Sequence, residues 1–223
     1  MRYIVRQLIA FIVAMLMLTP VYAQDESTMD SAILHLREFG FEIDDSVRER
    51  VWFSDPNSEE KTLYDVLMAM GIGKTTYDDG EWGWIPSSSQ VYAFDAEVFD
   101  ITLMYTFFLQ VVQAIVPDVV ISDVSEDLSG ITEDWVMPDD DFSTWTDGRR
   151  SVSFNCNGHP YTIELESWLD WINPGILDYM NQVLEAENCS CRLHAISEGE
   201  MVIIIYDIEE RADELRQMIP QGY

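Results

Sequence analysis

The sequence predicts an α+β fold, in which helices pack on a mainly antiparallel sheet and a small helical unit precedes this arrangement at the amino terminus. Alternating segments flank Asn157-Gly158, a pair that is typical of a two-residue hairpin turn. Six consecutive apolar residues, Met201–Tyr206, predict a central strand that is covered on both faces. The segment Ile101–Val116 carries no charge and has apolar residues at helical spacing, which predicts a buried core helix.

The first 23 residues have the pattern of a secretory signal peptide, in a form typical of bacteria. Arg2 and Arg6 form its positive start, the apolar run Leu8–Leu18 follows, and Val21-Tyr22-Ala23 offers small residues for cleavage at about Ala23. The run is shorter than the ~20 residues of a membrane-spanning helix. We therefore expect an exported chain, periplasmic or extracellular, with no stable membrane anchor.

A helical unit with its linker is expected over residues 24–86, and an α+β domain over residues 87–223. Apolar spacing and Gly punctuation define the elements of the first part. They are a polar lead-in Gln24–Ser31, helices Ser31–Phe39, Asp45–Trp52 and Ser58–Met70, and a loop Gly71–Ser89.

In the second part, strands and helices follow one another in short succession. Asn173 and Pro174 form the start signal of one helix, and Asp207 with Glu210 is the expected capping pair of the last. The last helix should face inward with Ile208, Ala212, Leu215 and Ile219. The other expected elements are strands Gln90–Phe94, Val119–Val124, Val152–Cys156, Tyr161–Leu165 and Arg192–Ile196, the helix to Ala186, and a long acidic loop Ser125–Arg150.

The chain is strongly acidic, with 12 Lys and Arg against 41 Asp and Glu and a net charge of −29. Loss of the leader with its two arginines would take this charge to −31. Such a charge argues against a nucleic acid, which binds clustered Lys and Arg, and favours a basic protein partner. We therefore expect a non-enzymatic binding protein, of the inhibitor or immunity type. An alternative is that the charge serves solubility alone.

Three cysteines, Cys156, Cys189 and Cys191, are an odd number, so at least one thiol stays free within the chain. Any bridge would join Cys156 to one of the other two, and three partly buried thiols are the alternative. His159 and His194 follow two of these cysteines at a short spacing, but residues three apart on a strand face opposite ways, which argues against zinc. The segment Asp139–Asp147 resembles a calcium loop but lacks its Gly and final Glu. No metal and no cofactor are therefore expected.

The sequence offers one candidate binding surface, formed by Trp82, Trp84, Asp95 and Glu97. Paired acids beside aromatic rings suit a sugar, so a secreted, carboxylate-dependent glycan hydrolase is the alternative function. No Ser–His–Asp or Cys–His nucleophile assembles from the sequence, which leaves an enzyme the less favoured interpretation. Trp168 and Trp171 are interpreted as packing the corner before a helix.

Overall fold

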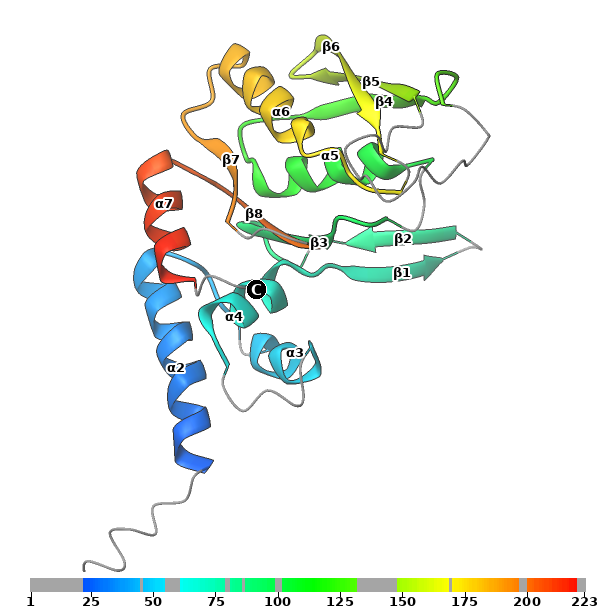
Figure 1. Cartoon of the computed structure of the whole chain (residues 1–223). Helices are drawn as coiled ribbons and strands as arrows, with labels where there is room; N and C mark the ends of the chain where they lie inside the picture. Colours follow the sequence, from blue (N-terminus) through cyan, green and yellow to red (C-terminus); the bar gives the residue numbers. More distant parts are fainter. Residues whose placement is uncertain are drawn as a thin grey trace, which may run out of the picture. The chain divides into compact units, whose positions relative to one another are not determined.

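The computed structural model describes residues 22–44, 46–54, 61–78, 81–85, 87–98, 102–131, 148–168, 170–196 and 200–219, with the backbone alone for 22–27, 52–54, 74–78 and 81–85. The fold is α+β, as predicted (Figure 1). Contacts divide the chain into two compact units, one up to Val66 and one from Leu67 onward. The sequence placed the division near residue 86, about twenty residues further along.

The amino-terminal unit opens with helix α2, Tyr22–Phe39. The expected lead-in Gln24–Ser31 is therefore wrong, because the helix includes it. The buried stripe of α2 begins with Met29 and continues at i+3, i+4 and i+7 through Ala32, Ile33 and Leu36. One further turn of apolar spacing thus lies before Ser31. The expected signal peptide lies almost wholly outside the described residues and stays a prediction.

Local caps define the next two helices, α3 (Ser46–Ser54) and α4 (Leu63–Gly71). Before α3, the Asp44 carboxylate accepts hydrogen bonds from the backbone N–H of Ser46 at 2.7 Å and of Val47 at 3.2 Å. Before α4, Thr62 and Asp65 bond reciprocally, backbone N–H to side-chain oxygen, at 2.6 and 3.4 Å. This box explains why α4 begins at Leu63, and the expected start at Ser58 lies outside the described residues.

The expected loop Gly71–Ser89 contains an antiparallel hairpin, which corrects the prediction. Strand β1 (Lys74–Asp78) pairs with β2 (Glu81–Ile85). The sequence places Asp79-Gly80 between the strands, a hairpin signal that the many Gly, Asp and Ser residues of this segment obscured. Gly71, at the end of α4, lies so close to strand β3 (Val91–Asp95) that an added Cβ would be 2.4 Å from the Ala93 nitrogen.

The second unit contains two three-stranded antiparallel sheets in addition to the β1–β2 hairpin. One has the order β3-β8-β7, from Val91–Asp95, Met201–Asp207 and Arg192–Ala195, and the other the order β4-β5-β6, from Ile121–Asp127, Gly148–Cys156 and His159–Ser167. The predicted central strand is confirmed as β8, whose Ile203, Ile204 and Ile205 are all buried. The predicted hairpin turn is also confirmed, with φ of 51° at Asn157 and 84° at Gly158.

Helices α5 (Met104–Ile115) and α6 (Gly175–Ala186) lie between the two sheets and touch both (Figure 1). The predicted buried core helix is α5, which buries side chains over most of its circumference. It contributes Met104, Tyr105, Phe108, Leu109, Val111, Val112 and Ile115 to the core. Because it is covered on two sides, its sequence shows almost no polar stripe.

Helix α7 (Glu209–Met218) packs on β7 and β8 through the buried Ala212 and Leu215. Two details differ from prediction. The Asp207 carboxylate does not form the expected capping pair but binds Arg211 at 2.8 Å, one turn along. Ile208 is 43% exposed rather than inward, because it precedes the helix in an extended conformation.

The expected loop Ser125–Arg150 is also corrected at both ends. Strand β4 continues to Asp127 and β5 begins at Gly148, while residues 132–147, with the calcium-like segment, lie outside the described residues. Arg150 and Glu126 form a buried ion pair at 3.4 Å. Glu126 also accepts hydrogen bonds from the backbone N–H and hydroxyl of Thr106, at 2.6 and 2.9 Å, at the start of α5. The charges of Glu126 and Arg150 suggested an exposed loop, but the two residues belong to strands because their charges are paired inside the fold.

Candidate functional site

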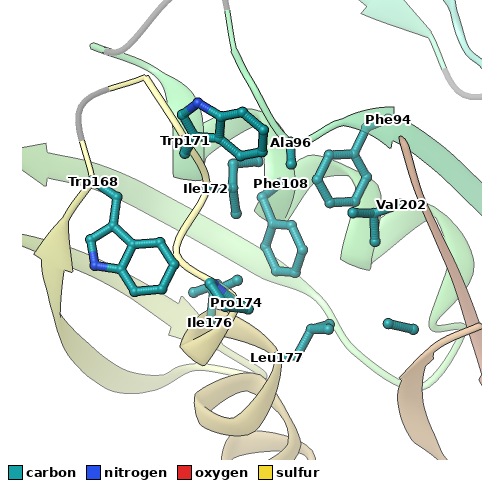
Figure 2. A pocket seen from close by; sticks show the side chains of 11 residues that line it. Phe94, Ala96, Phe108, Trp168, Trp171, Ile172, Pro174, Ile176, Leu177 and Val202 are labelled. Atoms are coloured by element: carbon teal, nitrogen blue, oxygen red, sulfur yellow. The ribbon is translucent and has the colours of Figure 1, made fainter. Parts of the chain in front are cut away.

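An apolar pocket of about 320 Å³ opens in the second unit, between the sheet β3-β8-β7 and the start of α6 (Figure 2). Its walls come from β3, α5, β7, β8, the β6–α6 connection and α6. The lining residues are Phe94, Ala96, Phe108, Trp168, Trp171, Ile172, Pro174, Ile176, Leu177, Ala195 and Val202.

Backbone hydrogen bonds join the segment after β3 to the β6–α6 connection and to Glu200, the residue before β8. Ala96, just after β3, donates its N–H to the Glu200 carbonyl at 2.7 Å and accepts from the Ile172 N–H at 2.8 Å. Trp171 donates its N–H to the Trp168 carbonyl at 2.9 Å, which closes the corner before α6. The pocket is therefore built by paired backbone rather than by a free loop.

Aromatic side chains form much of the lining. The rings of Phe94 and Phe108 meet edge to face, with centroids 6.4 Å apart. Trp168 and Trp171, from the β6–α6 connection, also line the cavity (Figure 2). Trp168 is 38% exposed, so a large apolar ring lies partly in water. The sequence interpretation of these tryptophans as corner residues agrees with their mutual backbone bond but missed the pocket that they line.

Among the residues that the structure describes, no ionisable side chain lines the pocket. The backbone N–H donors at the start of α6 are also engaged, because Gly175 donates to the Asn173 side chain at 2.9 Å and Leu177 to the Pro174 carbonyl at 3.1 Å. The pocket can therefore bury an apolar group, and its described lining supplies no acid or base.

The structure does not bring the four residues of the predicted surface together in the pocket. Trp82 and Trp84 lie on β2, and their side chains lie outside the described part. Asp95 and Glu97 are exposed, and Asp95 accepts the N–H of Glu97 at 3.0 Å. They flank Ala96 of the pocket without lining it, since successive side chains of an extended segment alternate.

A second polar cluster lies at the Asn157-Gly158 turn, around the carboxylate of Glu187. This carboxylate accepts hydrogen bonds from the Tyr161 hydroxyl at 2.6 Å, from His159 Nδ1 at 2.9 Å and from the Asn157 amide at 3.2 Å. These bonds lower the pKa of Glu187. The hydrogen bond between Tyr161 and Glu187 is also the main cause that raises the pKa of Tyr161 to about 12. The cluster ties the hairpin turn to the end of α6.

The three thiols are free. Cys156 and Cys189 are buried and Cys191 is half-buried, which agrees with the alternative of partly buried thiols. Burial raises the pKa of the Cys156 thiol to about 11. In the described part of the chain, no three His, Cys, Asp or Glu side chains gather in a way that would hold a metal ion.

Comparisons with protein-family models, with curated proteins and with solved structures find no match. The candidate site therefore depends on the chain's own residues alone. Over the residues that the structure describes, no helix combines the length and the hydropathy that a membrane span requires.

Proposed function

We propose that the protein is an exported, non-enzymatic binding or inhibitor protein that holds an apolar group of its ligand in this pocket. One observation carries the proposal: the described residues that line the pocket are all apolar or aromatic, and one of them, Trp168, is 38% exposed. Water forms few hydrogen bonds with such a surface. An apolar group of a ligand that displaces this water therefore lowers the free energy of the complex.

The size of the pocket sets the scale of the interaction. A cavity of about 320 Å³ is at the lower end of the range of ligand sites. Full burial of one Leu- or Phe-sized group contributes about 1.5–3 kcal/mol. This is less than a stable complex needs, so the pocket supplies an anchor and contacts outside it supply the remainder.

The glycan-hydrolase alternative gains no supporting contact. An acid or base must come within hydrogen-bond reach of the reacting group, whereas Asp95 and Glu97 lie beside the pocket and not in its lining. The alternative stays a prediction, which a panel of glycan substrates with Asp95→Ala and Glu97→Ala would test.

The binding proposal is tested with N-phenyl-1-naphthylamine, a neutral apolar dye that fluoresces when it leaves water. We expect the purified protein to bind the dye saturably. The variant Trp168→Ala should bind it about tenfold more weakly, because a large aromatic wall is lost. Tyr179→Ala is the matched control, since Tyr179 is a similarly exposed aromatic residue at 39% and lies on α6 outside the lining.

Circular dichroism would first show that both variants fold. Absence of saturable dye binding by the wild-type protein would overturn the proposal. Equal dye affinities in the wild type and in Trp168→Ala would place the dye elsewhere and would also overturn it.

A further inference from the structure

The surroundings of the pocket point to the chemistry of its occupant. We infer that the pocket receives an apolar side chain from a basic segment of a partner protein. The inference rests on the proposed function, which it makes more specific.

Four carboxylates adjoin the pocket lining. Asp95 and Glu97 are the two neighbours of Ala96 in the chain, and both are exposed. Asp170 lies between the two lining tryptophans, and the carbonyl of the exposed Glu200 accepts the Ala96 N–H at 2.7 Å. Acidic residues thus lie next to lining residues on both sides of the Ala96–Ile172 backbone bond.

None of these four carboxylates takes part in an ion pair within the described ranges. One arginine approaches the lining: the Arg216 side chain donates to the Ala195 carbonyl at 3.0 Å. Its charge is already engaged by Asp213 at 2.5 Å and Glu209 at 3.8 Å. The unpaired charges of the described residues next to the lining are therefore negative, and they act on a docked partner within a Debye length of about 8 Å.

Charge selects among occupants. The acidic residues next to the lining repel the carboxylate or phosphate of an amphiphile. An apolar side chain between Lys and Arg residues fits the apolar lining and the negative charge beside it. The exposed Trp168 ring also offers a face to a neighbouring cation.

Three fluorescent peptides of equal length test the inference by anisotropy. The first has a central Leu between Lys and Arg residues, the second has Ala in place of this Leu, and the third has Glu in place of every basic residue. At low salt we expect the first to bind, the second to bind about tenfold more weakly, and the third not to bind. High salt should weaken the first peptide, because screening removes the charge attraction.

Charge-neutralising variants locate the attraction. At low salt, the double variant Asp95→Asn/Glu97→Gln should bind the first peptide about fivefold more weakly than the wild-type protein does. At high salt, the variant and the wild type should bind this peptide equally well. Glu210→Gln/Glu214→Gln is the matched control, because it removes the same charge from exposed positions of α7, a helix that does not line the pocket. It should change the affinity much less.

The outcomes separate the two proposals. Saturable binding of the neutral dye without binding of the first peptide would overturn this inference and leave the proposed function standing. Failure of both dye and peptide would overturn both. Equal binding of the Leu and Ala peptides, or equal effects of the two double variants, would show attraction by net charge alone and would overturn the inference.

Discussion

Replacement of Arg150 by Met should destabilise the second unit more than any surface substitution in it. The Arg150 and Glu126 side chains are 0% and 2% exposed, and their charged atoms lie 3.4 Å apart. Arg150 also contacts Ser167 at 3.4 Å and lies over the Tyr105 ring at 5.5 Å. One side chain thus links β4, β5, β6 and α5.

The magnitude follows from the geometry. At 3.4 Å and an effective dielectric constant of about 20, the gross attraction is about 5 kcal/mol. Desolvation of both ions offsets much of this attraction in the intact pair. Removal of one ion leaves the other buried without its counter-charge, and measured losses in such cases are about 3–5 kcal/mol. Since Thr106 still donates to Glu126, we expect a loss of about 3 kcal/mol.

Urea unfolding at neutral pH, followed by circular dichroism, measures this loss. The double variant Glu126→Gln/Arg150→Met is the decisive control, because it removes both charges and keeps an acceptor for Thr106. It should recover about 1–2 kcal/mol relative to Arg150→Met. A loss below about 1 kcal/mol in Arg150→Met, or a double variant as unstable as the sum of the single variants, would refute the reasoning.

Three further predictions concern the titration of Glu126, the reactivity of the three thiols and the close approach at Gly71. Burial raises the pKa of Glu126 above its ordinary value of 4.5. At a pH just above 4.5, the Glu126 carboxyl therefore still holds its proton in the folded chain, whereas it has lost this proton in the unfolded chain. The free energy of unfolding should therefore fall as pH rises just above 4.5, and Glu126→Gln should lack this fall in urea titrations at a series of pH values. Ellman's reagent should label Cys191 first in the native protein, and Cys156 and Cys189 only on unfolding; fewer than three reactive thiols in urea would instead show a disulfide. Gly71→Ala should lower the free energy of unfolding by about 2 kcal/mol, because its Cβ would meet the backbone of β3 at 2.4 Å, and an unchanged unfolding midpoint would contradict this close approach.

The candidate site shows what a single sequence leaves out. Asp95 and Glu97 attracted notice as paired acids, and they do adjoin the pocket. The lining was not foreseen, because Phe94, Phe108, Trp168 and their neighbours come from five strands and helices that are far apart in the chain. Each such residue, considered alone, has the pattern of an ordinary core or corner position. A signal that was available is the pair of tryptophans in the corner before α6.

The sequence by itself determined those features that depend on near neighbours in the chain. Backbone sterics place φ > 0 at Asn157-Gly158, which specifies the β5–β6 turn, and a charge-free helical pattern specifies the buried α5. The unbroken apolar run specifies the central position of β8. These are local or periodic properties, and they persist whatever the rest of the chain does.

Only the tertiary structure decided where charged and polar segments belong. Glu126 and Arg150 belonged to an apparent acidic loop, yet they are 24 positions apart in the chain and meet in the core. Their burial is tolerable only because each neutralises the other and because Thr106 completes the bonding of the carboxylate. The apolar pocket has the same origin, since a cavity is a property of surfaces brought together by folding.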